Sequence, residues 1–427
     1  MHRRILCVAV TAALAGPAWS AEPSVTETNQ RLQTLEQRVD SLETAPSASP
    51  PASAGSFNPA VSLVLSGIYT NLSHDPVNYS ITGFPVALGM DIGPGQRGFS
   101  LAESELAIYA NIDPYFYGGM NYSLHADDTA SVEQAFIQTI ALNGGFSVMA
   151  GRFFSSIGYL NSQHSHVWDF VDAPLVYQAF LGGQFGDDAV QVKWLAPTDI
   201  FIEIGSELGR GRPFPGSDRD KNGVGASTVF AHIGGDMGIS SSWRAGLSVL
   251  NTSPQDREFD AADLSGNLVS NSFSGHSRTW IADAVWKYAP NGNPVYTNFK
   301  LQGEYMQRHE DGDVTYDPAG STSTAGYDAK QSGWYLQGIY QFMPYWRVGL
   351  RTERLDHGSV DYGMNNVNLA RYDFNPSRNS VMVDFSPSEF SRIRLQLAED
   401  KSSQGITDHQ VYVQYLVNIG AHPAHQY

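Results

Sequence analysis

The sequence predicts an all-β protein, a 16-stranded antiparallel transmembrane β-barrel that carries a short N-terminal coiled-coil helix. Segments in which apolar and polar residues alternate follow one another through most of the chain. The connections between them are short and long in turn, as the two ends of one barrel require. No stretch after the N-terminus approaches 18 consecutive apolar residues, so a helical membrane span is excluded. Together these observations indicate a wall of β-strands.

Residues 1–20 have the parts of a secretory signal peptide. Arg3 and Arg4 give a basic start, an apolar run follows, and a small-x-small sequence ends the segment. The apolar run is too short to span a bilayer, which favours export over a membrane anchor. The single cysteine, Cys7, lies in this segment, so the mature chain must hold together without disulfides.

Residues 21–44 predict a coiled-coil helix. Apolar positions are spaced alternately by three and four residues, with charged and polar residues between them. Self-association is the simplest way to bury this seam, although a helix that frays or lies on the barrel is the alternative, and the seam does not fix the number of helices. Residues 45–57 form a Pro/Ala/Ser linker that cannot pack and that separates the helix from the barrel. The seam consists of Val25, Thr28, Leu32, Leu35, Val39 and Leu42.

Residues 58–427 carry the barrel prediction. In the last strand, Val411, Val413 and Tyr415 alternate with Gln410, Tyr412 and Gln414, so that one face suits lipid and the other suits water. Counting strands across the alternating connections gives 16. Trp and Tyr residues near the strand ends fit the aromatic girdles of a membrane protein.

The segment Ser155–Asp188 interrupts this alternation after the fifth strand. It is too long and too aromatic for a turn, and neither helical nor strand periodicity runs through it. Its aromatic content argues against disorder, so we expect an ordered loop folded into the pore. The candidate residues of this constriction loop are His164, His166, Trp168, Asp169 and Asp172.

Charged residues of both signs fall on the face of the strands that is opposite the apolar one. Opposite charges facing one another across a lumen would create a transverse field that sorts polar solutes. Solvated wall charges without such a role are the simpler interpretation. The lumen charge candidates are Glu103, Glu105, Arg152, Lys193, Arg347, Arg351, Arg392 and Arg394.

A metal site is a further hypothesis for the constriction loop. His164 and His166 are separated by one residue, which puts both rings on one face of an extended backbone. With a carboxylate such as Asp169 or Asp172 nearby, they could form a transient Zn²⁺ site. An ordinary hydrogen-bond network is the simpler interpretation, and no other cofactor is expected.

The sequence gives no persuasive signature of an enzyme. It contains no His-Glu-x-x-His, no Gly-x-Ser-x-Gly and no phosphate-binding loop. His276 and Ser277 could suggest a barrel lipase, but no acidic residue is placed to orient the histidine. The net charge of −17 and the lack of a basic stripe argue against nucleic acid as a partner. We therefore expect a protein that is not an enzyme.

Several segments resemble a known family. FNPAVSLVLSGIY, AIYANIDPYFYG, AGRFFSSIGYLNSQHSHVWDFVDAP and WLAPTDIFIEIGSELGRG are similar to segments of a proteobacterial family labelled zinc-regulated outer-membrane porins, or sometimes TonB-dependent receptors. The receptor label fits badly, because a 22-stranded barrel and its plug need a longer chain. The coiled coil, the linker and a 16-stranded barrel with a long loop after its fifth strand resemble trimeric porins with an N-terminal coiled coil.

This resemblance implies a passive channel in the cell outer membrane of a Gram-negative bacterium. The channel would admit small hydrophilic solutes or ions, with a link to zinc uptake, and its partners would be outer-membrane lipid and two further copies in a homotrimer. The alternative from another class is an occluded barrel that serves as a binding or structural surface protein.

Overall fold

The structure is a computed structural model, and it describes residues 59–420 except 91, 128, 219 and 221. The predicted signal peptide, coiled-coil helix and linker lie outside the described residues, as does the tail after residue 420. Within the described part of the chain, no helix is long and apolar enough to cross a membrane.

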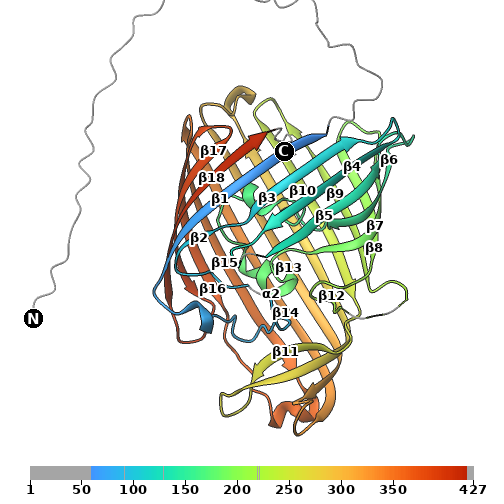
Figure 1. Ribbon diagram of the computed structural model, residues 1–427, viewed down its shortest axis with the longest axis vertical. Helices are drawn as coiled ribbons and strands as arrows, with labels where there is room; N and C mark the ends of the chain where they lie inside the picture. The colour runs from blue at the N-terminus through green and yellow to red at the C-terminus, as the bar shows by residue number, and fades with distance from the viewer. Residues whose placement is uncertain (1–58, 91, 128, 219, 221, 421–427) are drawn as a thin grey trace, which may run out of the picture. The chain divides into compact units, whose positions relative to one another are not determined.

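One antiparallel sheet closes on itself to form a barrel (Figure 1). Closure is made by β1 (Ala60–Leu72) and β18 (Asp408–Gly420), which pair along 11 consecutive positions from Ser62↔Gly420 to Leu72↔Gln410. Of the 18 strand segments, β2 and β3 both pair with β1 and form one interrupted wall strand, while β11 pairs with β12 beyond the end of β10. The wall therefore has 16 strands, and the predicted fold class is confirmed.

The remaining segments follow one another around the wall in chain order, so nearly every strand pairs with its neighbours in sequence. They are β2 (Gly98–Leu101), β3 (Ser104–Asn111), β4 (Phe116–Leu124), β5 (Ala130–Thr139), β6 (Phe146–Phe154), β7 (Gly186–Leu195), β8 (Phe201–Gly209), β9 (Ala226–Met237), β10 (Ser241–Thr252), β11 (Arg257–Ala262), β12 (Leu268–Tyr288), β13 (Asn298–Tyr316), β14 (Ser323–Met343), β15 (Trp346–Asp361), β16 (Ser377–Ser388) and β17 (Ser391–Lys401).

The two faces of the wall differ in polarity as predicted. On β18, Val413 and Tyr415 are exposed on the outer face, whereas Gln410 and Gln414 are buried on the inner one. The same alternation of exposed apolar and buried polar residues runs through β17 and through the parts of β13 and β14 nearer the short turns. In the far parts of β13 and β14 it is reversed, since Val314 and Tyr327 are buried whereas Asp313 and Asp328 are exposed. An apolar outer face suits lipid, and closure of the sheet satisfies the backbone polar groups that an open edge would leave unpaired in a membrane.

Strands β12 to β15 extend well past the length that a membrane requires. β12 and β14 each have 21 residues, and β13 and β14 stay paired from Asn298↔Gln341 to Tyr316↔Ser323. Residues 309–331 are therefore mostly the far end of a hairpin. These extensions project from the end of the barrel opposite the one where β1 begins and β18 ends (Figure 1).

The apolar core lies inside the barrel. It is built on the segment between β6 and β7, residues 155–185, which we call the inner loop. Within it, α2 (Leu175–Leu181) is buried on all sides and ends at Gly182, whose left-handed φ of 68° stops the helix. The segment between β1 and β2 contributes Ile81 and Phe84 to the same core. Short 3-10 helices occur at Pro76–Asn78, Ser165–Val167, Pro290–Gly292 and Gly363–Val367.

Candidate functional site in the barrel lumen

The inner loop crosses the lumen and contacts opposite sides of the wall. It leaves the wall at the end of β6, the fifth wall strand, and returns at β7, and α2 lies within the barrel outline (Figure 1). Its hydrogen bonds reach β3 and β5 on one side and β13 to β17 on the other. The inner loop therefore folds into the lumen, as the sequence predicts.

Two aspartates fasten the inner loop to a basic part of the wall. Asp169 lies 2.5 Å from Lys300 Nζ and 3.2 Å from Arg347 Nη1. Asp172 lies 2.8 Å from both Arg351 Nη2 and Arg378 Nη1. These four cations come from β13, β15 and β16, so each aspartate bridges two side chains of the wall.

The charges of this basic wall lower the pKa of both aspartates. Burial acts to raise the pKa of Asp169, but Lys300 and Arg347 outweigh it and hold the pKa well below its usual range. For Asp172, burial is likewise outweighed, chiefly by the guanidinium of Arg351, and the pKa is lowered. Both carboxyls are therefore ionised at neutral pH, which keeps the ion pairs in place.

Two further arginines bind the backbone of the inner loop. Arg392 donates to the carbonyl oxygen of His166 at 2.6 Å, and Arg394 donates to that of Trp168 at 2.9 Å. Trp168 is buried in the lumen core and donates through its indole to Gln163. Seven of the residues predicted from sequence thus meet in one set of contacts: Trp168, Asp169, Asp172, Arg347, Arg351, Arg392 and Arg394.

Wall carboxylates accept hydrogen bonds from the backbone of the inner loop. Glu304 accepts from the amides of Tyr159 at 3.2 Å and Leu160 at 3.0 Å, and also from the hydroxyl of Tyr177. Glu353 accepts from the amide of Leu175 at the start of α2. Buried amides need such partners, and the sequence pattern could place these glutamates inward but could not pair them with distant amides.

The opposite side of the lumen is acidic and binds the two histidines. His164 Nδ1 lies 3.0 Å from Glu105 Oε2 on β3 and 2.9 Å from Glu133 Oε2 on β5. His166 Nδ1 lies 3.4 Å from the same Glu105 oxygen, and the two imidazole rings stack with centroids 5.6 Å apart. The carboxylates that meet the histidines are thus Glu105 and Glu133, and not Asp169 and Asp172 as predicted.

A β-bulge in β5 supplies part of this acidic site. Asn121 of β4 pairs with Gln134, and the next residue, Tyr122, pairs with Val132, so Glu133 is an extra residue in β5. As a result, both Glu133 and Gln134 reach His164, the latter with its Oε1 3.2 Å from Nε2. A bulge re-aims side chains in this way next to functional sites, and no sequence signal marks it here.

The two histidines have pKa values shifted in opposite directions. Burial acts to lower the pKa of His164, but the carboxylates of Glu105 and Glu133 outweigh it and raise the pKa to about 10. Burial dominates at His166 and lowers its pKa, although Glu105 opposes the shift. His164 therefore carries a positive charge beside the carboxylate of Glu105 at neutral pH.

The remaining lumen candidates lie at separate places. Glu103, between β2 and β3, accepts from the hydroxyl of Ser165 at 2.8 Å, so it belongs to the acidic side. Lys193 on β7 lies 3.5 Å from Glu203 on β8, away from the inner loop contacts described above.

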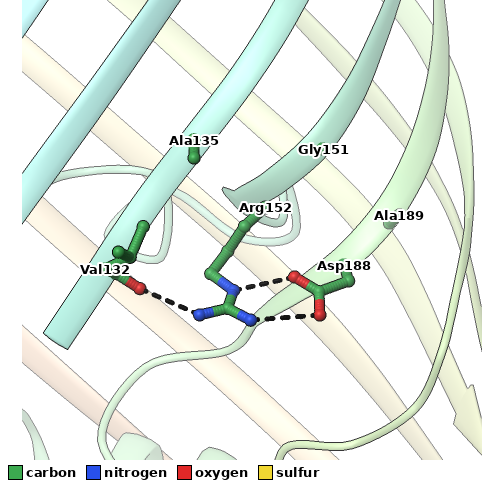
Figure 2. Close-up of a pocket in the computed structure, with 6 residues that line it drawn as sticks. All are labelled: Val132, Ala135, Gly151, Arg152, Asp188 and Ala189. Carbon is green, nitrogen blue, oxygen red and sulfur yellow. Dashed lines mark hydrogen bonds and ion pairs between the residues drawn. The ribbon is translucent and has the colours of Figure 1, made fainter.

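The prediction that Arg152 faces the lumen is wrong. It pairs with Asp188 of β7, and this register places both residues on the outer face that they share with Val190 and Val192. Figure 2 shows the surroundings of Arg152, where β5 and β6 pair only as far as Ala135↔Arg152 and then separate. Arg152 spans the gap by donating to the carbonyl oxygen of Val132 at 3.2 Å and to both oxygens of Asp188. A recess of about 470 Å³ lies there, lined by these residues, Ala135, Gly151 and Ala189.

His276 and Ser277 are not arranged as a catalytic pair. They are adjacent on β12, so their side chains point to opposite faces of the sheet. His276 lies on the exposed face and Ser277 is buried. A histidine on the far side of a strand cannot accept the proton of that serine.

The closed 16-stranded wall with an inner loop defines a porin-type barrel, and this places the protein in the outer membrane of a Gram-negative bacterium. Similar solved structures are a loop L8 deletion mutant of OmpT, an outer membrane protein of Vibrio cholerae, and OprB of Pseudomonas putida at high pH. Both superpose with a TM-score of 0.50. The OmpT mutant is 8% identical, and the match covers 85% of this chain and 99% of the OmpT chain. OprB is 13% identical, and the match covers 91% of this chain and 97% of the OprB chain. At such identities the likeness concerns the fold alone.

The chain belongs to the same family as an uncharacterized protein of Aquifex aeolicus (strain VF5). The two are 32% identical over 360 residues, which cover 78% of this chain and 71% of the relative. No protein-family model matches the chain, and the resemblance to zinc-regulated porins is not supported.

Proposed function

We propose that the protein is an outer-membrane channel through which small hydrophilic solutes or ions diffuse passively, along a lumen that the inner loop narrows. The supporting observation is the lining of the wall. Sixteen strands enclose a lumen wide enough for an aqueous path, and its inner face carries Lys193, Glu203, Lys300 and Arg347, all of which are partly exposed.

The degree of exposure differs along the lumen and indicates where water reaches the wall. Near the short turns, the side chains of Lys193 and Arg347 are 27% and 25% exposed. Further from the short turns, where they bind Asp172 of the inner loop, Arg351 and Arg378 are each 2% exposed. The narrowest part of the path is therefore at the inner loop, and an ion that passes it encounters fixed charges of both signs.

Conductance across a planar bilayer tests this proposal. The purified full-length protein should give small current steps, and a variant in which residues 156–185 are replaced by a short Gly/Ser linker should give larger ones. Absence of steps from both proteins, after each is shown to be folded by its heat-dependent mobility on a denaturing gel, would contradict a channel.

An occluded barrel is the second candidate function, and one observation favours it. The inner loop and the segment after β1 bury an apolar cluster in the lumen, in which Leu175, Val176 and Tyr177 are fully inaccessible to water. If this cluster seals the barrel, the intact protein gives no steps and the loop-deleted variant does. That outcome would indicate a binding or structural surface protein instead of a diffusion pore.

Two further parts of the proposal concern assembly and catalysis. We propose a homotrimer, for which the predicted helix of residues 21–44 supplies the seam. Removing that segment should lower the mass of the detergent-solubilised particle measured by light scattering.

We also propose that the protein has no enzymatic activity. The wild-type protein should hydrolyse esters only at the background rate, and Ser277→Ala should leave that rate unchanged.

A further inference from the structure

We propose that His164, His166 and Glu105 bind one divalent transition-metal ion of the Zn²⁺ class, with Glu133 as a fourth ligand, and that the ion fastens the inner loop to the acidic side of the wall. Metal binding is independent of whether the barrel conducts, so this proposal and the channel can fail separately.

The donor atoms lie at the separations that a small cation requires. The ligand atoms of Glu105, His164 and His166 are all within 4.8 Å of one another. In a tetrahedral site with bonds of about 2.1 Å, neighbouring ligand atoms are about 3.4 Å apart. The distances here are 3.4 Å from His166 Nδ1 to Glu105 and 3.0 Å from His164 Nδ1 to Glu105. Small side-chain rotations, together with release of the proton on His164 Nδ1 to solvent, would therefore admit the ion.

Two carboxylates converge on a single nitrogen of His164. Glu105 Oε2 and Glu133 Oε2 both lie within 3.0 Å of His164 Nδ1, which can carry only one hydrogen. The single N–H of Nδ1 can donate a well-aligned hydrogen bond to only one of these two oxygens, whereas a divalent cation at this place would attract both at once. Among the described residues, the ion pairs of Glu105 and Glu133 are made with histidine alone.

The local backbone is built to assemble this group. The extra residue in β5 turns both Glu133 and Gln134 toward His164, where a regular strand would turn only one of them inward. His166 is held by Arg392, which donates to its carbonyl oxygen. The donors thus come from two wall strands and the inner loop, and an ion would join all three.

Outer partners that metal ligands usually have are also in place. The far nitrogen of His164, Nε2, lies 3.2 Å from Gln134 Oε1, so with Nδ1 bound to metal it would donate to this amide oxygen. The second oxygen of Glu105 accepts from the Asn121 side chain, whose own oxygen accepts from the hydroxyl of Tyr109. Such contacts fix the orientation of the ligands before the ion arrives.

The site has a route for entry and a donor set that selects the class of metal. The side chains of His164 and Glu133 are 18% and 14% exposed, so an ion in the lumen can reach them. Two imidazole nitrogens with carboxylate oxygens suit Zn²⁺, Co²⁺ and Ni²⁺, whereas Mg²⁺ and Ca²⁺ prefer oxygen ligands alone.

Binding of Zn²⁺ and Co²⁺ to the purified full-length protein, prepared without a histidine tag and stripped with a chelator, tests the proposal. We expect one Zn²⁺ per chain by calorimetry, and with Co²⁺ the visible absorption bands of a site of low coordination number. The variant His164→Gln/His166→Gln should bind Zn²⁺ at least about 100-fold more weakly, and Asn121→Ala about 10-fold to 100-fold more weakly.

The matched control is His309→Gln, which alters an exposed histidine that pairs with Asp328 on the wall. It should bind Zn²⁺ as the native protein does. To guard against a misfolded double variant, Glu133→Gln is measured in parallel and all variants are checked for heat-dependent gel mobility. Unchanged Zn²⁺ binding in the folded double variant, or Co²⁺ spectra typical of six oxygen ligands, would overturn the proposal.

Discussion

At the scale of single residues, the charged side chains of the lumen serve mainly to hold the inner loop. Arg347 shows this use, since it bridges Asp169 of the inner loop and Asp384 of the wall. Buried or half-buried ion pairs cost desolvation, and they remain favourable only when their hydrogen bonds are complete. Here each loop aspartate has two cationic partners, whose attraction offsets part of that desolvation cost.

Asp169→Asn should loosen the inner loop. The substitution leaves Lys300 without its carboxylate partner, whereas Arg347 keeps its pair with Asp384. We therefore expect the free energy of docking of the inner loop to fall by about 3 kcal/mol, near the lower end of the range for breaking a buried ion pair. Hydrogen exchange should reveal faster exchange in residues 155–185. The control Asp328→Asn removes an exposed pair with His309 and should leave exchange in the inner loop unchanged.

The docking of the inner loop should also depend on pH in a defined direction. The pKa values of Asp169 and Asp172 are lower in the folded protein than in the unfolded chain. Their contribution to stability is therefore present above the ordinary aspartate pKa of about 3.9 and is lost as the pH falls through the lower folded values. Exchange in the inner loop should be unaffected by these aspartates between pH 7 and 5. Loosening near pH 5 that Asp169→Asn abolishes would contradict the assignment.

At the scale of elements, α2 acts as a small apolar core enclosed by the wall. Phe180 is inaccessible to water, its ring lies 5.9 Å from that of Phe84, and the guanidinium of Arg308 lies 4.9 Å from its ring centre. Removing a buried aromatic ring leaves a cavity that its neighbours fill only in part. The helix is thus held by packing as much as by the ion pairs around it.

Phe180→Ala should destabilise the packed inner loop without opening the wall. We expect a loss of about 3–5 kcal/mol in loop docking, because the ring is fully buried. Limited proteolysis should cut within residues 155–185 sooner in this variant, while the barrel keeps its heat-dependent mobility. Val77→Ala, at a position 83% exposed in the segment after β1, is the control and should leave the cleavage rate unchanged.

The sequence predicts the elements of the wall better than it predicts the site. Alternation in β18 identifies its two faces because a regular strand repeats every two residues. The bulge at Glu133 breaks that period by one residue, so the inward turn of both Glu133 and Gln134 cannot be read from a pattern. The contacts of Asp169 depend on partners more than 100 residues away, which no local pattern encodes.

At the scale of the whole molecule, closure between β1 and β18 joins the two ends of the wall. Ser66 and Leu416 are directly opposite one another in this seam, and both side chains are buried on the inner face. Because β1 and β18 pair along their length, neither is left as an edge strand, and every strand of the wall has two neighbours. The barrel thereby surrounds the inner loop completely.

An engineered disulfide should report this closure. The native chain has one cysteine, in the predicted signal peptide, so Ser66→Cys/Leu416→Cys introduces a single pair whose β-carbons are near bonding distance. We expect the oxidised protein to migrate faster than the reduced one after heat denaturation. Ser66→Cys/Tyr415→Cys places the thiols on opposite faces of the seam and should not cross-link.

The opposite charges on the two sides of the inner loop also have a consequence for the order of assembly. Histidines meet the acidic strands β3 and β5, and aspartates meet the basic strands β13 to β16, so the loop fits the lumen in one orientation. These strands are far apart in the chain and come to face each other only when the sheet has curled round. We therefore expect the inner loop to dock last, after the wall has formed, so that an unclosed intermediate would still leave its apolar helix open to a chaperone.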